Sequence, residues 1–455
     1  MQNNIHRFIL LIFFSFMLIF HGCDKKGSWA DDRVILISID GLQGEIILHP
    51  EKYGFKTDDL PHFSRLKNMG SYSGQVQTIF PSQTYPAHTS IITGEVPPVH
   101  GIINNRLFAP ESNFSDWYWF ADSIKVPTLI DKAYEKNLIT LSISWPVTVG
   151  APATYMLAEI QSTSDSVSTL DLVRKYDVPN LFLEKAKIRG AIRVDKTPKD
   201  YDRDLLLHQL FLDSFKRYRP HLSLYHIIQT DYEQHDFGKI SPEVKKAYVF
   251  ADSLIGNILS LIDINNLWDT TTLIVTGDHG FKNHDKGLNV NRLFADKGWL
   301  TIDNNGQIEN WDVVCLSSGG SAFVRLIDST NEAFKKDVQL MLAQQSEFEL
   351  FENRHLIGML SSGDKEDFVL LAKDGFSFIR NNKKPYIYES FGGNHGGNPS
   401  EPTLFTGFMS AGRGIQKNVN IGQMASTQIA PFVSDLLLLD LNCNAKPINV
   451  SINNN

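Results

Sequence analysis

The fold is decided by the stretch Val34-Ile-Leu-Ile-Ser-Ile-Asp40, in which an apolar run ends directly at a carboxylate. The length of the run and its β-branched residues predict a buried strand. The same pattern returns twice, because Leu222–Ile228 is followed by Asp231 and Thr271–Val275 by Asp278. In open α/β sheets the site forms at the carboxyl ends of the strands. The three carboxylates are therefore predicted to meet at one edge of a sheet.

Helical segments alternate with these strands. Pro127–Asn137 is predicted to be a helix and Leu138–Ser144 the strand after it, and apolar residues between Ala251 and Ile262 recur at helical spacing. The alternation predicts the α/β class, with a mainly parallel sheet flanked by helices on both faces. Residues 151–200 show little periodicity and many charges, so we expect a surface excursion there. Residues 285–390 separate two ligand segments and are predicted to form an inserted subdomain.

The composition limits the partners. The chain has 455 residues, 42% of them hydrophobic, which is enough for one large core with an insertion. It has 43 Lys and Arg against 51 Asp and Glu, a formal charge of −8, and no long basic run. This balance argues against a nucleic-acid polymer as a partner. A local positive site can still exist, because bound metal ions add charge.

The amino terminus has the features of an export signal. Arg7 precedes a short apolar run, Phe8 to Phe20, and then comes Gly22-Cys23. The run is too short for a spanning helix, and Gly22-Cys23 resembles a lipoprotein cleavage box in which Cys23 receives the lipid. An ordinary signal peptide without an anchor is the alternative. We expect a signal over 1–23, a tether over 24–31 and a folded domain over 32–450, exported to face the periplasm or cell surface and held to the membrane only by the lipid.

Seven residues have the types and local settings to close around two metal ions. They are Asp40, Thr84, Asp231, His235, Asp278, His279 and His395. Carboxylate and imidazole without thiolate suit catalytic zinc, or a similar divalent ion, better than a closed structural zinc site. The prediction is two Zn²⁺, with Mn²⁺ or another divalent ion able to serve. The chain has two further cysteines, Cys315 and Cys443. They could form a disulfide or remain free thiols, and the sequence favours neither.

The segment from Phe80 to Gly94 contains the candidate nucleophile. Pro86 suits the first turn of a helix and Gly94 suits its end, which places Thr84 at the amino end. There the free N–H groups and the helix dipole favour negative charge. A hydroxyl beside a metal ion at that place could ionise and attack phosphorus. Read alone, the segment allows the simpler interpretation that Thr84 only caps the helix.

Together these segments resemble the alkaline phosphatase superfamily and, within it, the nucleotide pyrophosphatase/phosphodiesterase family. The resemblance runs from about Val34 to about Ile415, with the ligand segments in the family's order. It implies an alkaline phosphatase-like catalytic domain with two zinc sites. One zinc would be held by Asp231, His235 and His395, and the other by Asp40, Thr84, Asp278 and His279. Asn105 falls where the family has a donor to a phosphoryl oxygen.

The chain departs from the family pattern near the site. Ala87 stands where many nucleotide-cleaving members have Asn, and Gln234 replaces the usual Gly before the motif histidine. Exported monoesterases of this type have a Lys and an Arg after the strand that follows the nucleophile helix, and residues 142–150 contain neither. Tyr85 and Trp145 are predicted to line an apolar pocket, with core packing as the alternative. His88 and His284 are the expected neighbours of the metal ligands.

The resemblance and the missing cations favour hydrolysis of phosphodiesters through a phosphothreonine intermediate. The predicted substrate is a small molecule, or a lipid or glycan phosphodiester. A phosphomonoesterase of the same fold and an envelope phosphoryl-group transferase are the alternatives among enzymes. An exported binding protein with a relic site is the alternative from another class. The complete ligand set argues against the relic, which would be expected to have lost some ligands.

Overall fold

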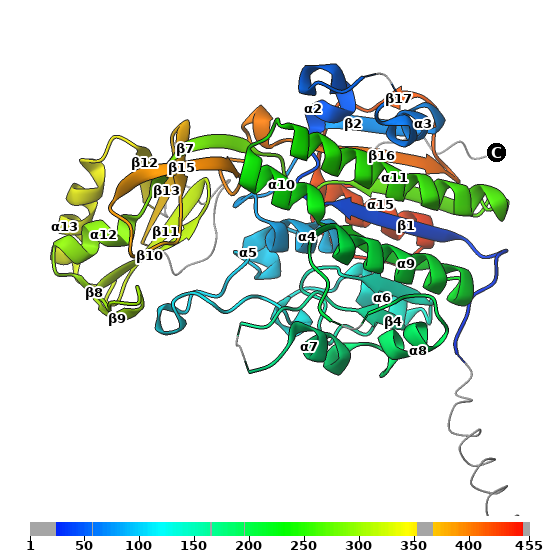
Figure 1. Ribbon diagram of the computed structural model, residues 1–455, viewed down its shortest axis with the longest axis horizontal. Helices are drawn as coiled ribbons and strands as arrows, with labels where there is room; N and C mark the ends of the chain where they lie inside the picture. Colours follow the sequence, from blue (N-terminus) through cyan, green and yellow to red (C-terminus); the bar gives the residue numbers. More distant parts are fainter. Residues whose placement is uncertain (1–23, 57, 164–165, 195, 353–366, 449–455) are drawn as a thin grey trace, which may run out of the picture.

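The computed structural model describes residues 24–56, 58–163, 166–194, 196–352 and 367–448. The predicted signal segment, with Cys23, lies outside these residues. The chain forms a large body around an extended sheet and a smaller lobe beside it (Figure 1).

The large body is built on a nine-stranded sheet. Its strands are β1 (Arg33–Ile39), β2 (Ser71–Gln77), β3 (Thr140–Ile143), β4 (Tyr155–Leu157), β5 (Leu222–Ile227), β6 (Thr271–Thr276), β16 (Thr406–Gly412), β17 (Val419–Asn420) and β18 (Gln423–Ala425). Their order is β17-β2-β16-β6-β1-β5-β3-β4, and β18 pairs with β2. The five strands from β6 to β4 are parallel, whereas β16 is antiparallel to both neighbours. The predicted mainly parallel sheet is confirmed.

Helices cover both faces of this sheet (Figure 1). One face packs against α3 (Pro61–Met69), α9 (Asp200–Tyr218) and α11 (Pro242–Ile264), and the other against α4 (Thr84–Thr93), α6 (Leu129–Glu135) and α15 (Ile429–Leu437). Strand β1 shows why the sheet needs two layers, because successive side chains of a strand point to opposite faces. Ile35, Ile37 and Ile39 join the first core, and Val34 and Leu36 join the second.

Helix α11 is long and apolar enough to cross a membrane, yet 61% of its most apolar window is buried inside the protein. Ala251, Leu254, Ile255 and Ile258 on one of its faces are at most 2% exposed. The helix begins after Ser241, whose hydroxyl accepts from the backbone N–H of Val244. Its apolar face is therefore used in the core.

The expectation for residues 151–200 is wrong. This segment supplies β4, the edge strand of the main sheet, and the short helices α7 (Thr169–Tyr176) and α8 (Phe182–Ile188). Phe182 and Leu183 are fully buried against α9. The helices are too short for their periodicity to stand out among the charged residues, and only the tertiary contacts show which side chains are buried.

The predicted subdomain is present as a smaller lobe, at the left of Figure 1. Its four-stranded sheet is antiparallel, in the order β10-β11-β13-β12. The lobe comprises β8 (Leu300–Ile302), β9 (Ile308–Trp311), β10 (Val313–Ser318), β11 (Ser321–Leu326), β12 (Phe348–Glu352), β13 (Phe368–Ala372), α12 (Val290–Asp296) and α13 (Glu332–Ala343). A three-stranded sheet joins the lobe to the body, and it consists of β7 (Lys282–Leu288), β14 (Gly375–Phe378) and β15 (Ile387–Asn394). Strand β15 returns the chain to the body just before His395.

The two cysteines outside the signal segment are free thiols. Cys315 is buried in β10 within the smaller lobe, where burial raises the pKa of its thiol. Cys443 lies beside Gly94, at the end of α4 in the large body. The two residues therefore occupy different parts of the molecule, and no disulfide joins them.

Candidate active site

Three acidic residues meet at the carboxyl edge of three neighbouring parallel strands. Asp40 follows β1 directly, and Asp278 follows β6 after one glycine. Asp231 lies in the first turn of α10 (Gln229–Phe237), the helix that begins just after β5. Because β5, β1 and β6 are adjacent in the sheet, their ends bring carboxylates that are far apart in sequence into one place.

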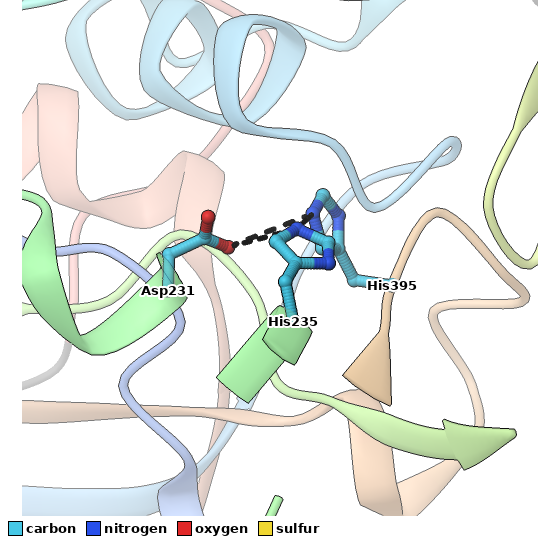
Figure 2. Close-up of side chains that lie close together, drawn as sticks. All are labelled: Asp231, His235 and His395. Carbon is cyan, nitrogen blue, oxygen red and sulfur yellow. Dashed lines mark hydrogen bonds and ion pairs between the residues drawn. The ribbon is translucent and has the colours of Figure 1, made fainter. Parts of the chain in front are cut away.

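The first group of candidate ligands is Asp231, His235 and His395, shown in Figure 2. Asp231 and His235 lie one turn apart on α10, so their side chains share a face of the helix. Asp231 Oδ1 is 3.4 Å from His235 Nε2 and 3.7 Å from His395 Nε2, and the two imidazole Nε2 atoms are 3.2 Å apart. Three potential ligand atoms therefore converge on one point.

The second group surrounds His279 Nε2. Asp278 Oδ2 lies 3.1 Å from this atom, Asp40 Oδ1 lies 3.4 Å away and Thr84 Oγ1 also lies 3.4 Å away. Asp231 is close to this group as well, because ligand atoms of Asp40, Asp231 and His279 all lie within 4.8 Å of one another. Asp231 therefore stands between the two groups, and the seven predicted ligands form one continuous cluster.

Glycines on both sides of His395 have no side chain, and this lets the backbone approach α10 and the smaller lobe closely. A side chain at Gly392 would meet the carbonyl oxygen of His235 at 2.2 Å, and one at Gly396 would meet the carbonyl oxygen of Ser318 at 2.0 Å. Gly396 also has a φ of +89°, a conformation that favours glycine. The Gly-Gly-Asn-His-Gly-Gly sequence is thus explained by the contact of β15 with α10 and with the smaller lobe.

All three candidate histidine ligands present the same nitrogen to the cluster. Their Nδ1 atoms each lie near a backbone carbonyl oxygen: His395 near Ser82 at 2.8 Å, His235 near Gly393 at 3.0 Å and His279 near Gly280 at 3.3 Å. An Nδ1–H that donates to a carbonyl leaves the lone pair on Nε2. The backbone therefore selects the tautomer that suits metal binding.

The electrostatics of the cluster fit bound cations. Buried carboxylate oxygens of Asp40 (Oδ1), Asp231 (Oδ1) and Asp278 (Oδ2) have no hydrogen-bond partner among the described residues. Burial, and then the charge of Asp231, raises the pKa of the Asp40 carboxyl well above its usual value, and burial followed by Asp40 does the same for Asp278. Carboxylates packed this way repel one another unless positive charge lies between them.

Two of the histidines, His279 and His395, are held neutral by their burial. Burial, and then the neighbouring His235, lowers the pKa of His395 to about 3. Burial, followed by His395 and His235, lowers the pKa of His279 well below its usual value. Neutral imidazoles and charged carboxylates are the forms that bind divalent ions, so the donor set of this cluster fits zinc or a similar metal.

Thr84 is the first residue of α4, as its sequence predicts, but it does not cap the helix. The capping position is Gln83, with no side-chain cap hydrogen bond, and Gly94 ends the helix with a φ of +74°. Thr84 Oγ1 instead faces His279 Nε2 at 3.4 Å, and the Thr84 residue is 8% exposed. Its hydroxyl therefore lies at the candidate metal cluster and at the positive end of a helix dipole.

Asn105 lies beside Thr84 but is already hydrogen-bonded. Its Oδ1 accepts from the backbone N–H of Tyr85 at 2.8 Å, and its Nδ2 donates to Gln83 Oε1 at 2.9 Å. The side chain thus connects the residues on either side of Thr84. A phosphoryl oxygen would have to replace one of these partners to receive a hydrogen bond from Asn105 or from the Tyr85 amide.

Tyr85 and Trp145 are both buried, and their role in a pocket wall stays a prediction. Tyr85 is 1% exposed, and its hydroxyl donates to Glu159 Oε1 at 2.9 Å. Trp145 is 0% exposed and packs edge-on against His88. The motif around each residue places its backbone correctly, but burial depends on neighbours that arrive from elsewhere in the chain.

The two departures from the family pattern are also buried. Ala87 is 0% exposed within α4, and Gln234 is 0% exposed within α10. Gln234 Nε2 donates to the carbonyl oxygen of Gly41 at 2.9 Å, which ties the helix with Asp231 to the loop after Asp40. Gln234 therefore contributes to the packing around the cluster, and neither side chain is exposed to solvent.

Two further histidines contact the candidate ligands. His226 Nε2 is 3.2 Å from Asp40 Oδ2, and His88 Nδ1 is 3.6 Å from Asp278 Oδ2. His226 Nδ1 lies 3.1 Å from Oε2 of Glu159. Glu159 was missed because it falls in the segment expected to be a surface excursion. The one sequence feature that could have pointed to Glu159 is its position just after the short apolar run that forms β4.

The fold and the ligand set together define an alkaline phosphatase-like protein with a candidate two-metal site at the carboxyl edge of its sheet. The family is established by a direct match. Residues 34–398 match the profile of the Type I phosphodiesterase / nucleotide pyrophosphatase family. The chain belongs to this family.

Curated relatives are distant in sequence. The chain is 26% identical over 275 residues to human ectonucleotide pyrophosphatase/phosphodiesterase family member 1, which covers 58% of this chain and 25% of that protein. It is 22% identical over 431 residues to the mouse bis(5'-adenosyl)-triphosphatase enpp4, covering 90% of this chain and 79% of that protein. The chain thus spans about a quarter of the first relative and most of the second.

Solved structures share the fold. Human ectonucleotide pyrophosphatase/phosphodiesterase 5 has a TM-score of 0.63 and 19% identity, covering 92% of this chain and 97% of that one. The murine protein of the same name, an inactive threonine-to-alanine variant in complex with AMP, has a TM-score of 0.64 and 18% identity, with coverages of 92% and 97%. The likeness spans the large body and the smaller lobe.

Proposed function

We propose that this protein is an exported, metal-dependent phosphodiesterase that hydrolyses phosphodiester bonds through a phosphothreonine intermediate on Thr84. The observation that carries the proposal is the position of Thr84 Oγ1. It lies 3.4 Å from His279 Nε2, the atom around which Asp40 and Asp278 also gather. A threonine at the amino end of a helix and inside a cluster of metal ligands is placed to act as a nucleophile.

The ligands divide into two sets that would each hold one ion, with zinc as the proposed metal. Asp231, His235 and His395 form one set, and Asp40, Thr84, Asp278 and His279 form the other. When bound, the two ions supply positive charge that lowers the pKa of hydroxyl groups and neutralises phosphoryl oxygens. Manganese is the second candidate, since it accepts the same oxygen and nitrogen donors.

The residues of the chain then perform two displacements at phosphorus. Thr84 Oγ1 loses its proton, attacks the phosphorus and forms a P–O bond, while the bond to the first alcohol breaks and that alcohol leaves with a proton. Water next attacks the phosphothreonine, the P–Oγ1 bond breaks, and the Thr84 hydroxyl is restored with release of a phosphate monoester. Asn105 Nδ2 and the Tyr85 amide are placed beside Thr84 to stabilise the equatorial oxygens, once released from their present partners.

A diester is favoured over a monoester by the charges near the cluster. A monoester dianion needs more cationic partners than a diester monoanion. Arg203 on α9 is a nearby cation that sequence reasoning missed, since it is among the charges that offset the effect of burial on the pKa of Asp40 and Asp231. Its guanidinium Nε, however, is already 3.6 Å from Asp204. Because Arg203 supplies a positive charge near the cluster, a phosphomonoesterase is the second candidate. Because this charge is paired with Asp204, a phosphodiesterase remains the first candidate.

Export and anchoring rest on the sequence at the amino terminus and on the relatives. The signal-like run and Gly22-Cys23 support a lipoprotein anchored through Cys23. The relatives are named as ectonucleotide enzymes, and a venom phosphodiesterase from Naja atra is 22% identical over 431 residues. These names support a site outside the cytoplasm. Labelling with radioactive palmitate in cells would detect the lipid, and Cys23→Ser should abolish the label.

The proposal is tested by hydrolysis of bis-p-nitrophenyl phosphate and p-nitrophenyl phosphate by the zinc-loaded protein. We expect higher kcat/KM for the diester, and a loss of more than about 10³-fold in Thr84→Ala. The variant should retain its zinc, measured by mass spectrometry, because six of the seven ligands remain. Thr89→Ala is the matched control, since it makes the same change later in α4.

Full activity in Thr84→Ala would remove the nucleophile from the proposal. A higher kcat/KM for p-nitrophenyl phosphate would select the phosphomonoesterase instead. Transfer of the phosphoryl group to an added alcohol in preference to water would select the transferase. Purified protein that binds no zinc or manganese would revive a binding protein with a relic site.

A further inference from the structure

Glu159 is a fourth carboxylate at the carboxyl edge of the main sheet. It lies two residues after β4, the last strand of the parallel order β1-β5-β3-β4. Its side chain is 12% exposed, close to the 13% of Asp231, yet it belongs to neither group of candidate ligands. Removing a carboxylate from water costs free energy unless hydrogen bonds replace the water. The partners of Glu159 therefore show what its burial serves.

His226 lies between Glu159 and Asp40. It is the next-to-last residue of β5, the strand between β1 and β3. Its Nδ1 lies 3.1 Å from Glu159 Oε2 and 3.1 Å from the carbonyl oxygen of Ser144. A carbonyl oxygen can only accept, so Nδ1 carries a hydrogen and donates. These two acceptors fix the ring, and its Nε2 is thereby directed at Asp40 Oδ2, 3.2 Å away.

This contact gives the two oxygens of the Asp40 carboxylate different roles. Oδ2 faces His226, whereas Oδ1 is buried with no hydrogen-bond partner among the described residues. Oδ1 is also the oxygen that lies 3.4 Å from His279 Nε2, inside the second group of candidate ligands. A carboxylate that is held at one oxygen offers the other to an ion in a fixed orientation. His226 therefore selects the Asp40 oxygen that an ion meets.

The second oxygen of Glu159 reaches the helix of the candidate nucleophile. Glu159 Oε1 accepts from the Tyr85 hydroxyl at 2.9 Å. Tyr85 directly follows Thr84 in the first turn of α4 and is 1% exposed. One carboxylate therefore joins the helix that carries Thr84 to the imidazole that holds Asp40. A displacement of about 1 Å between reacting groups is enough to slow a reaction greatly, so such a connection has a use.

We propose that Glu159 is a positioning residue, which orients Asp40 towards its ion through His226 and sets the place of Thr84 relative to that ion through Tyr85. The inference rests on the proposed function, because it concerns the same reaction. The alternative is that Glu159 acts only through its negative charge near the ions. The two differ in a measurable way, since an oriented contact requires His226 and a charge effect does not.

The experiment measures how many zinc ions each variant retains over a series of chelator concentrations, by mass spectrometry. We expect Glu159→Gln to lose one zinc at about tenfold lower chelator concentration than the wild-type protein, as is usual when a partner of a metal ligand is removed. His226→Asn should show a loss of at least this size. Adding Glu159→Gln to His226→Asn should then cause no further loss, because the contact it breaks is already gone.

Glu95→Gln is the matched control. It makes the same change at a buried glutamate just after the far end of α4, where both carboxylate oxygens accept from Asn444. The visible absorption of the cobalt-loaded protein gives a second reading, since it reports the geometry of the ligands around the ion. We expect the bands to shift in Glu159→Gln and to stay unchanged in Glu95→Gln.

Tyr85→Phe tests the other contact, because it removes the hydroxyl and keeps the ring. We expect it to retain zinc as the wild-type protein does. For bis-p-nitrophenyl phosphate, its kcat should fall about tenfold with little change in KM, since Thr84 moves and the ion does not. Zinc loss in Tyr85→Phe equal to that in Glu159→Gln would contradict the division between the two contacts.

Glu159→Asp separates position from charge and replaces the glutamine variant if that one does not fold. It keeps the charge but is one methylene too short to reach Tyr85 and His226 together, so it should lose zinc as Glu159→Gln does. Wild-type zinc retention in Glu159→Asp would overturn the inference. An equal effect of Glu159→Gln with and without His226 would overturn it as well, because the carboxylate would then act by charge alone.

Hydrolysis of bis-p-nitrophenyl phosphate by the wild-type protein reads the proposed function separately. Zinc losses that depend on His226 in a wild-type background without turnover would refute the phosphodiesterase and leave the orientation of Asp40 by Glu159 standing. Normal turnover with independent zinc losses would do the reverse.

Discussion

The two halves of the candidate metal site differ in how deeply they are buried. The side chains of Asp278 and His279 are 0% exposed and that of Asp40 is 3% exposed, whereas His235 is 35% and Asp231 13% exposed. The inner half is attached directly to the ends of β1 and β6. The outer half is assembled from α10 and from the chain that returns from the smaller lobe through β15. The inner half is thus set by the sheet, and the outer half by parts added to it.

This difference has a consequence for the ions. An ion among Asp40, Asp278 and His279 would be held by groups that folding has already removed from water. An ion at Asp231, His235 and His395 would lie nearer to solvent, where exchange is easier and where a leaving group can enter and depart. We therefore expect the two halves to respond differently to substitution and to metal supply.

The largest expected effect comes from Asp278→Asn in the inner half. The asparagine keeps an oxygen that can accept from the backbone N–H groups of Gly41 and His279, each now 3.0 Å from Asp278 Oδ1. It removes the negative charge that an ion requires. We expect diester hydrolysis to fall more than about 10³-fold, with no recovery in excess zinc. Recovery in excess zinc would show that the inner half is not set by the sheet.

A smaller effect is expected for His235→Gln in the outer half. The substitution removes one imidazole ligand and leaves Asp231 and His395. We expect activity in trace zinc to fall about 10²-fold and to recover largely when zinc is supplied in excess, because the defect is in affinity. Zinc titration of the activity measures the shift. A loss as complete and as irreversible as that of Asp278→Asn would abolish the distinction between the halves.

The smallest effect concerns the stability of the metal-free protein. Burial, and then Asp231, raises the pKa of Asp40 well above its usual value, whereas in the unfolded chain this carboxyl ionises near pH 4. Between these two pKa values the folded protein binds more protons than the unfolded chain. Its stability therefore falls as the pH rises through that window. Asp40→Asn removes the charge and hence this contribution.

We expect the Tm of Asp40→Asn in a chelator to exceed that of chelated wild-type protein by roughly 2 °C at pH 8, and the difference to vanish towards pH 4. Asp122→Asn, at an exposed position, is the control and should show no such difference. With zinc bound the order should reverse, because the Asp40 carboxylate then has a positive partner. An Asp40→Asn protein less stable than wild type in chelator at pH 8 would contradict the repulsion described above.

The sequence by itself determined the framework and the list of candidate ligands. Runs such as 34–39 and 271–275 are long enough, and rich enough in apolar and β-branched residues, to predict buried strands. The carboxyl ends of adjacent parallel strands must share an edge of the sheet. That local rule is sufficient to predict the α/β class and to gather Asp40, Asp231 and Asp278. The order of the motifs was sufficient to identify the family.

Only the tertiary structure decided what surrounds those ligands. Burial belongs to a neighbourhood rather than to a residue type, so the sequence alone left open whether Tyr85 and Trp145 are buried. Glu159 falls in the segment that was expected to be a surface excursion, and it lies 3.1 Å from His226, which contacts Asp40. Arg203 was not singled out in the sequence, and its charge acts on Asp40. Periodicity reports which side of an element is apolar, but not which distant segment covers it. A cavity of about 340 Å³ exists because the short helices α7 and α8 and the long helix α9 close around it. That packing depends on contacts between segments that are separate in the sequence.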